Sequence, residues 1–439
     1  MLQTLRNAWK IPELRKKLIF TMLILLVYRI GNVIPVPFVQ IRELKDFYNE
    51  VLSSTILGLY NAMSGSAFSL ASVLALGIQP YINASIIVQL LTIAIPALER
   101  WAKEEGEEGK KKIEKLTRYA TVVLGVMLGF AYYTMISSQT NPLTGNAILS
   151  QQGFWPACVI ILAFTAGSSV VMWLGEQITE FGIGNGISMI LFANIISGIP
   201  GGVGNLISLF PNGWWVAIIA AVVMVALVVF IVFINDAERR IPVQYAKRVV
   251  GRKVYGGQNT NLPIKVAMSG VMPVIFASSI CTIPGTIATF AGATDGNWYK
   301  YVFATTSWVY FAVYMLMIFF FSWFYSTIQY DPVEIANNMK KNGGFIPGFR
   351  PGKPTADFIK KVINKIVIFG AVYLAIVAGL PVLTGVIANL DSIAGSQFAN
   401  MGSLAIGGTS VIIVVGVALE TVKALEAQML MRHYKGFLD

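Results

Sequence analysis

Long runs of apolar residues alternate with short polar segments along nearly the whole chain. The clearest of these runs are 18–27, 82–95, 122–131, 157–174, 214–234, 302–324 and 366–387. A helix needs about 20 apolar residues to cross a bilayer. At membrane depth each backbone amide must also be bonded within its own segment, so helical spans are the default. The pattern therefore predicts an all-α polytopic membrane protein.

Division of the chain at the polar segments gives ten predicted spans. They cover approximately residues 18–36, 73–97, 119–138, 153–174, 187–203, 213–234, 264–289, 302–328, 366–388 and 404–423. One further segment, residues 57–72, is apolar enough for a helix but is short and rich in small residues. Its topology is not decided by hydropathy alone.

The distribution of positive charge predicts the orientation. The sequence has 33 Lys and Arg residues. Of these, 29 fall before the first span, in three connections (100–118, 239–265 and 340–365) or after residue 422. The opposite side has only Arg42, Lys45 and Lys300, and Arg29 lies within the first span. Because Lys and Arg accumulate in cytoplasmic loops, we expect these basic segments and both termini to be cytoplasmic.

The same count decides the topology of residues 57–72. If this segment crossed the membrane, every later basic loop would change sides and the asymmetry would be lost. We therefore expect the segment to enter the bundle without crossing it, or to lie at the outer surface. A non-spanning insertion at membrane depth is tolerated where protein covers it or where it lines an aqueous cavity. The prediction is a bundle with a central cavity and a re-entrant segment inside it.

The second and seventh spans begin alike. Residues 77–87 (GIQPYINASII) and 270–280 (GVMPVIFASSI) share six of eleven positions. A weaker similarity relates residues 186–191 to 408–413. Each half, 1–212 and 213–439, has five spans. Because five is an odd number, the second half starts on the opposite side of the membrane, so the two halves must be inverted relative to each other. Inverted repeats place the functional site at the repeat interface near the midplane, which makes spans two, five, seven and ten the candidates to line a path.

Aliphatic residues occupy the candidate path. The six positions are Ile78, Ile82, Ile187, Leu191, Ile275 and Ile413. Ordinary helix packing explains such residues. An aliphatic constriction that excludes water and blocks ions also explains them, and β-branched Ile is stiff enough to keep the shape of such a ring. The residues alone leave both interpretations open.

Few ionisable residues lie within the spans. A solute transporter places such groups at depth for its substrate or coupling ion, whereas here only Arg29 lies well inside a span. Arg29 either bonds carbonyls or snorkels, or it lines a wet outer vestibule. A solute transporter with inverted repeats is therefore the alternative function, and a membrane scaffold is a third class that needs no re-entrant segment.

The sequence gives little support for an enzymatic function. The one histidine, His433, is near the C-terminus, and Cys158 and Cys281 fall in apolar runs. The Gly-rich segment 182–186 resembles a nucleotide loop but follows a membrane helix rather than a strand, so a tight connection explains it. We expect no catalytic residue, no metal site and no cofactor.

Two long connections are strongly basic. Residues 235–265 have seven basic and two acidic residues, and residues 329–365 have seven and three. Both contain hairpin-like patterns, at 253–257 and 345–352, whereas residues 100–118 are closer to neutral and indicate a solvated hairpin. Long basic projections fit an anionic partner, which is nucleic acid, an acidic protein face or lipid headgroups.

Several strings together resemble the SecY family, the channel subunits of the bacterial Sec translocon. They are residues 29–31 (RIG), 34–37 (IPVP), 77–85 (GIQPYINAS), 173–180 (WLGEQITE), 184–188 (GNGIS), 245–248 (YAKR) and 347–352 (PGFRPG). The resemblance extends from the first span to the tenth. It implies ten transmembrane helices in two inverted five-helix halves, with a re-entrant plug helix. It also implies that the six aliphatic residues form a pore ring.

The resemblance assigns further sites. The implied plug, at about 57–72, contains Tyr60, Asn61, Ser64, Gly65, Ser66 and Phe68. The implied lateral gate, between spans two–three and seven–eight, contains Asn83, Ser85, Gln89, Ala267, Ser278 and Ser279. The implied docking residues are Arg239, Arg240, Lys247, Arg248, Arg252, Lys253, Lys340, Lys341 and Arg350. Leu191 stands where Ile is frequent in the family, and Ala267 stands where many relatives have a polar gate residue.

The family also implies function and partners. The expected function is passive conduction of unfolded polypeptides across the bacterial plasma membrane and lateral insertion of helices into it. The expected partners are SecE and SecG as further subunits, the motor ATPase SecA, the ribosome, signal peptides, unfolded secretory proteins and membrane lipids. Energy is expected to come from the docked motor or ribosome.

Overall fold

The protein is described by a computed structural model that covers residues 2–52, 56–208, 210–245, 248–250, 253–255, 259–268, 270–290, 307–388 and 408–435. The elements up to residue 208 are α1 (Leu2–Lys10), α2 (Pro12–Gly31), α3 (Ile41–Phe47), the π-helix η1 (Tyr48–Leu52), α4 (Ile56–Ser64), α5 (Gln79–Ala94), α6 (Pro96–Lys103), α7 (Gly106–Ser138), α8 (Phe154–Phe181) and α9 (Gly186–Ser208).

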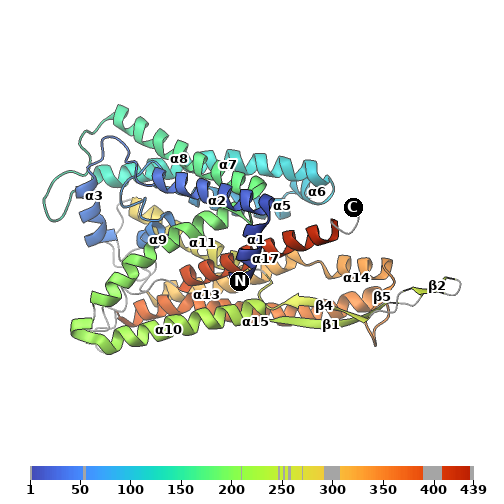
Figure 1. Cartoon of the computed structure of the whole chain (residues 1–439). Helices are drawn as coiled ribbons and strands as arrows, with labels where there is room; N and C mark the ends of the chain where they lie inside the picture. The colour runs from blue at the N-terminus through green and yellow to red at the C-terminus, as the bar shows by residue number, and fades with distance from the viewer. Residues whose placement is uncertain are drawn as a thin grey trace.

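The remaining elements combine helices with short strands. They are α10 (Phe210–Asp236), β1 (Glu238–Tyr245), β2 (Arg248–Val250), β3 (Lys253–Tyr255), β4 (Asn259–Lys265), α11 (Met272–Phe290), α13 (Trp308–Gln329), α14 (Pro332–Lys341), β5 (Gly344–Phe345), α15 (Lys353–Ala388) and α17 (Gly408–Lys435). Figure 1 shows α2, α5, α7 and α8 on one side of the helical bundle and α10, α13, α15 and α17 on the other.

Each of the ten predicted spans contains one main helix: α2, α5, α7, α8, α9, α10, α11, α13, α15 and α17. Within the described residues, four helical segments are long and apolar enough to cross a membrane alone: 106–138, 154–181, 308–341 and 353–380. The bent pair α5–α6 makes a fifth, and 186–201, 221–236 and 272–284 are shorter apolar helices. The helical, multi-pass architecture is confirmed, and the number of ten crossings stays a prediction.

Proline residues move two predicted boundaries. The first span was expected at 18–36, but α2 begins at Pro12, as proline favours the first turn of a helix, and it ends at Gly31. The second was expected at 73–97, but α5 runs from 79 to 94. Pro96 removes a backbone donor and forces Ile95 into an extended conformation, so α6 leaves α5 at an angle of 107°.

The glycine-rich connection between α8 and α9 has a structural explanation. Gly184 has a φ of +73°, which glycine adopts without strain. A Cβ on Gly186 would lie 1.9 Å from the carbonyl oxygen of Gly175, so α8 and α9 approach too closely for any other residue. The expected tight connection is confirmed, and close packing explains these glycines without a nucleotide.

The two long basic connections form one module, named here the basic module. Strands β4, β1 and β5 form an antiparallel sheet in that order, which joins residues 238–265 to Gly344–Phe345. Apolar residues of this sheet, α14 and the start of α15 share a separate core that includes Ile241, Ile264, Met339 and Ile359. Figure 1 shows this module and α6 at one end of the bundle, with α3 at the other.

One expectation about these connections needs correction. Residues 345–352 do not form a hairpin of their own, because β5 pairs with β1 of the other connection. Residues 100–118 form a hairpin as expected, and it is a helical one, since α6 ends at Lys103, α7 begins at Gly106 and the two helices contact each other. Of the hairpin pattern at 253–257, residues 253–255 form β3, which pairs with β2, and residues 256–257 lie outside the described residues.

Candidate functional site

Four helices begin at the positions that the internal repeat relates. Helix α5 begins one residue before Pro80, and α11 begins one residue before Pro273. Helices α9 and α17 begin at the aligned residues Gly186 and Gly408. Contacts join α5 to α11 and α9 to α17. Each repeat-related pair of helices, with one helix from each half of the chain, is therefore in contact.

The six aliphatic candidates, named here the aliphatic cluster, all belong to the main apolar core of the bundle, which also includes residues of α2, α8, α13 and α15. Five are buried in this core, namely Ile78 directly before α5, Ile82 of α5, Leu191 of α9, Ile275 of α11 and Ile413 of α17, and Ile187 packs against the core. None of the five is more than 4% exposed. The cluster is therefore dry and closed, as packing requires and as a shut constriction also requires.

The predicted re-entrant segment forms a short helix and a series of turns. Helix α4 ends at Ser64, and turns follow up to Ile78. Met63 of α4 belongs to the main apolar core, and its sulfur accepts a hydrogen bond from the Gln79 amide at the start of α5 at 3.2 Å. Helix α4 contacts both α9 and α11. The segment therefore lies between the two sets of helices.

The turns after α4 are fixed by internal hydrogen bonds. The Oδ1 atom of Asn61 accepts from the Ser69 amide at 2.9 Å, and the Ser64 hydroxyl accepts from the Phe68 amide at 3.2 Å. Ser66 has a φ of +69°. Of the predicted plug residues, Asn61, Ser64 and Phe68 are buried and Ser66 is exposed.

Aromatic side chains fasten the same segment to α7. The Tyr132 hydroxyl donates to the Phe68 carbonyl at 2.8 Å, and the two rings meet edge to face with centroids 4.7 Å apart. Phe164 of α8 continues the stack beyond Tyr132 at 4.8 Å. Tyr60 contacts Phe68 from the other side and donates to the Leu76 carbonyl at 3.3 Å. Edge-to-face pairs of this kind contribute about 0.5–1.5 kcal/mol each beyond buried area.

Arg29 contacts the re-entrant segment. Its guanidinium donates to the carbonyl of Gly65 at 3.4 Å. Arg29 is therefore bonded to a main-chain carbonyl, as its first interpretation expects.

The predicted gate residues divide into two groups. Gln89 of α5 accepts a hydrogen bond from the Tyr325 hydroxyl of α13, which joins the two helices directly. Ser278 and Ser279 of α11 line a cavity of about 10 Å³ together with Tyr60, Met63, Gln79 and Thr282. This cavity lies between α4, α5 and α11, so three elements meet there.

The other gate residues have fewer contacts. Asn83 and Ser85 are half-buried on α5. The Oδ1 atom of Asn83 and the hydroxyl of Ser279 are buried without a hydrogen-bond partner among the described residues. Ala267 lies in the turn before α11 and is not part of the cavity.

The predicted docking residues lie on or near the basic module. Arg239, Arg240, Lys340, Lys341 and Arg350 are exposed. Arg240 also pairs with Glu238 at 2.7 Å. Arg248 and Lys253 belong to β2 and β3, whereas Lys247 and Arg252 lie outside the described residues.

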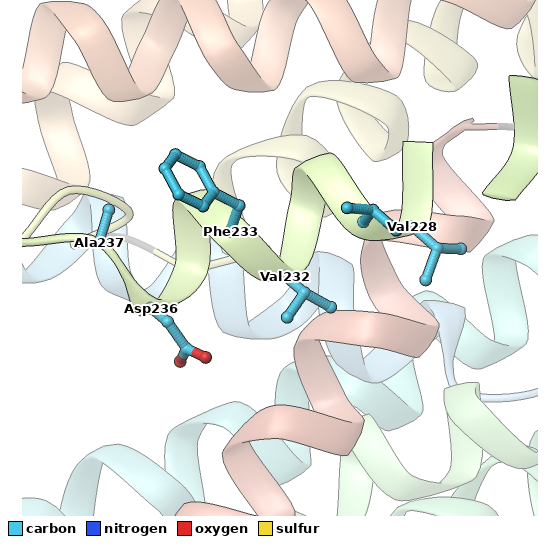
Figure 2. Close-up of a pocket in the computed structure, with 6 residues that line it drawn as sticks. Val228, Val232, Phe233, Asp236 and Ala237 are labelled. Carbon is cyan, nitrogen blue, oxygen red and sulfur yellow. The ribbon is translucent and has the colours of Figure 1, made fainter. Parts of the chain in front are cut away.

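A groove near the end of α10 contains none of the six aliphatic candidates among its lining residues (Figure 2). It has a volume of about 570 Å³ and is lined by Val228, Val229, Val232, Phe233, Asp236 and Ala237. Val229 and Phe233 are 63% and 71% exposed, so the groove faces the outside of the bundle. Asp236 at its end pairs with Lys423 of α17 at 2.8 Å.

Sequence reasoning missed several residues of the site. Asn194 lies within an apolar run of α9, and a lone amide in such a run is a usable signal, since buried polar groups need partners. Tyr132 and Tyr325 lie among many aromatic residues in the spans, where no pattern distinguishes them. No group of three His, Cys, Asp or Glu side chains able to hold a metal occurs in the described part of the chain.

Comparisons with known proteins agree with this geometry. The SecY family model matches residues 72–422. A protein of Streptomyces galbus, described as "Protein translocase subunit SecY", is 42% identical over 453 residues, with 100% of both chains covered. The similarity extends over the full length of both sequences.

Three solved structures share the fold. One, described as "The structure of a protein conducting channel", has a TM-score of 0.63 at 19% identity. Another concerns the plug domain of a SecY protein and has a TM-score of 0.62 at 18% identity. The third is Sec61 in a canine ribosome–channel complex, with a TM-score of 0.58 at 17% identity. Each covers 94% of this chain and is itself covered to 92%. This chain belongs to the SecY family.

Proposed function

We propose that this chain is the channel-forming subunit of a protein translocase, through which unfolded polypeptides are secreted and from which apolar helices enter the lipid. The observation that carries the proposal is the dry aliphatic cluster where α5, α9, α11 and α17 begin. As a pore ring, Ile78, Ile82, Ile187, Leu191, Ile275 and Ile413 exclude water and ions when the channel is empty. The chain acts as a passive conduit and not as an enzyme.

The plug is the segment 57–72, of which residues 57–64 belong to α4. The contacts of α4 with α9 and α11, and the hydrogen bond from Gln79 to the Met63 sulfur, support this assignment. A related structure describes a plug domain that stabilises the closed channel and maintains a membrane seal. In this chain, Tyr60, Asn61, Ser64, Gly65, Ser66 and Phe68 give the plug its internal bonds and its contacts.

The lateral gate lies where α5 meets α11 and α13. The Gln89–Tyr325 hydrogen bond crosses this boundary, and the small cavity lined by Ser278 and Ser279 lies beside it. An apolar signal peptide that separates α5 from α13 breaks the Gln89–Tyr325 hydrogen bond and replaces it by apolar contacts with the two helices. Asn83, Ser85 and Ala267 line the approach to this boundary.

The basic module is the docking site for the energy source. Its exposed Arg and Lys residues and its own apolar core give a rigid positive surface that fits an acidic protein face or ribosomal RNA. The partners are SecA or the ribosome there, with SecE and SecG as further subunits. The ribosome-bound Sec61 complex is a relative in which a channel of this fold meets such a partner.

The proposed location is the bacterial plasma membrane, with both termini and the basic module in the cytoplasm. The positive-charge count supports this orientation. The proposed halves are 1–212 and 213–439, with the path between them. Their repeat-related helices meet in pairs, which supports this division.

Reconstituted vesicles test the function. Vesicles that contain the chain with its partner subunits should take up an unfolded secretory protein when the motor and ATP are supplied. They should not accumulate small solutes against a gradient. Solute accumulation without protein uptake would favour the alternative, an inverted-repeat transporter.

A further inference from the structure

Helix α4 ends in a turn that bonds only some of its last carbonyl groups. The final carbonyls of an α-helix lack partners within the helix. Gly65 has a φ of +66°, and its amide donates to the Ala62 carbonyl at 3.2 Å. The Ser66 amide donates to the Asn61 carbonyl at 2.9 Å. These two bonds form a Schellman motif, which leaves the next carbonyls without a local partner.

Three side chains from elsewhere in the fold bond those carbonyls. Met63 accepts from Asn194 at 2.8 Å, Ser64 accepts from Asn32 at 3.2 Å, and Gly65 accepts from Arg29 at 3.4 Å. Each carbonyl that the motif leaves open therefore has a donor. The end of α4 is capped by other helices and not by its own sequence.

The three donors come from one part of the molecule. Arg29 lies on α2, Asn32 follows α2 directly, and Asn194 lies on α9. Asn194 is 1% exposed, and its amide also donates to the hydroxyl of Tyr28 at 2.8 Å, which orients it. A buried amide is costly without hydrogen bonds, so two amides in apolar surroundings indicate a specific role. The positive charge of Arg29 also suits the C-terminal end of a helix.

Gly65 allows the close approach that these bonds need. A Cβ at this position would lie 2.6 Å from Nη1 of Arg29 and 2.7 Å from Oδ1 of Asn194. Any other residue would push both side chains away from the end of α4. Two features of the site therefore require glycine, namely the left-handed backbone conformation and the lack of space for a Cβ atom.

We infer that Arg29, Asn32 and Asn194 form a capping latch, which binds the main-chain carbonyls at the end of α4 and holds this segment against α2 and α9. This inference rests on the proposal that the segment is the plug, and it adds the groups that keep the plug seated. The latch recognises backbone, so it depends on Gly65 and on the helix end rather than on the side chains of α4.

The test measures the exposure of the segment. Ser69 is 7% exposed, and a Ser69→Cys change nearly preserves the size of the side chain. The reactivity of a cysteine there therefore measures how often the segment leaves its buried position. Cys158 and Cys281 are first replaced by alanine. In the assembled complex in lipid vesicles, a membrane-impermeant maleimide should label this cysteine slowly. Gly65→Ala should increase the labelling rate at least tenfold.

Matched controls isolate the latch from general strain. Gly145 has a φ of +71°, and a Cβ there would meet no atom within 4 Å. Gly145→Ala therefore introduces the same backbone strain away from the latch and should leave labelling unchanged. Arg29→Gln should accelerate labelling, whereas Arg42→Gln, which removes an exposed charge, should not. Arg29→Gln serves as the decisive variant if Gly65→Ala fails to assemble.

Conductance separates this inference from the plug assignment. Faster labelling in the latch variants together with an ion leak supports both. Faster labelling without a leak supports the latch but contradicts the plug. Unchanged labelling in Gly65→Ala and Arg29→Gln overturns the latch, and if deletion of residues 60–70 still opens a leak, the plug assignment survives.

Discussion

Gly77 and Gly270 adopt the same left-handed backbone conformation, with φ of +53° and +57°, three residues before the proline in the first turn of α5 or α11. In each turn the glycine amide donates to the carbonyl three residues earlier, Leu74 or Ala267. The sequence repeat is thus also a repeat of backbone geometry. It places Ile82 and Ile275 at equivalent positions on two helices that contact each other.

Substitution of these glycines should destabilise the protein unequally. A left-handed conformation costs an L-residue about 1–2 kcal/mol. At Gly270 a Cβ would also lie 3.1 Å from Oε1 of Glu420, whereas at Gly77 the nearest atom is 3.7 Å away. Thermal unfolding of the purified protein should therefore show a larger decrease in Tm for Gly270→Ala than for Gly77→Ala.

Gly198 provides the control for that series. It lies within α9, and a Cβ there would have nothing within 4 Å. Gly198→Ala should not lower the Tm, because alanine is favoured over glycine inside a helix by about 0.5–1 kcal/mol. Equal decreases at all three positions would show that the left-handed turns have no special role.

The basic module should depend on its own core. Ile359 of α15 is fully buried in the core that α15 shares with the sheet. Ile359→Ala should lower the free energy of local unfolding by about 2–5 kcal/mol. Amide hydrogen exchange in β1 and β4 would report this as faster exchange, with α7 and α8 unchanged. The neighbouring Lys360 is exposed, so Lys360→Ala should alter exchange little.

Charge reversal at Arg350 should block docking without unfolding the module. The Arg350 side chain is exposed, and its main-chain carbonyl accepts a hydrogen bond from the Thr355 hydroxyl at 2.8 Å. Arg350→Glu should reduce motor- or ribosome-dependent export at least tenfold with an unchanged Tm. Lys360→Glu makes the same charge change elsewhere and should export normally. Normal export by Arg350→Glu would remove this residue from the docking site.

The loop between α7 and α8 should loosen in acid. The Glu43 carboxylate accepts from Asn141 at 2.5 Å, from Thr144 at 2.6 Å and from Asn146 at 3.3 Å. Hydrogen bonds from Thr144 and Asn141 hold the pKa of Glu43 below its usual value of 4.5. The stabilisation is therefore fully present above that value and is lost as the pH falls through the lowered pKa.

Limited proteolysis of residues 139–153 between neutral pH and about pH 3 would measure this change. The wild type should become more susceptible at the acid end of the range. Glu43→Gln, which cannot ionise, should be susceptible at neutral pH and show a flatter profile. A wild-type loop that stays protected throughout would argue against the carboxylate as its anchor.

Hydropathy and repetition predicted most of the architecture. Each apolar run contains a helix among its described residues, because the bilayer constraint leaves little choice of secondary structure. The repeat located the aliphatic cluster, since Ile82 and Ile275 are aligned positions in it. The count of basic residues indicated that 57–72 does not cross, and the structure places a short helix and turns there.

The contacts between segments far apart in the chain could not be predicted from the sequence. The β1–β5 pairing joins two connections far apart in the chain, and β5 has only two residues, too few for any pattern. The Tyr132–Phe68 and Tyr325–Gln89 contacts likewise depend on how helices pack rather than on local spacing. Pro96 is a signal for the bend, since proline inside a helical pattern breaks or kinks the helix. The predicted span 73–97 nevertheless continues through it, because the preceding residues 82–95 form one apolar run.

Single-channel conductance tests the central claim, that the aliphatic cluster and the plug seal a polypeptide channel. In planar bilayers the wild type should be nearly silent. Deletion of residues 60–70, or replacement of Ile82 and Ile275 by Gly, should open an ion leak. Ile87→Gly and Ile283→Gly are the controls, because these residues lie on the same two helices but are 42% and 41% exposed. A leak in the cluster variants alone is the expected result, and silence in both the deletion and the double variant would contradict the account.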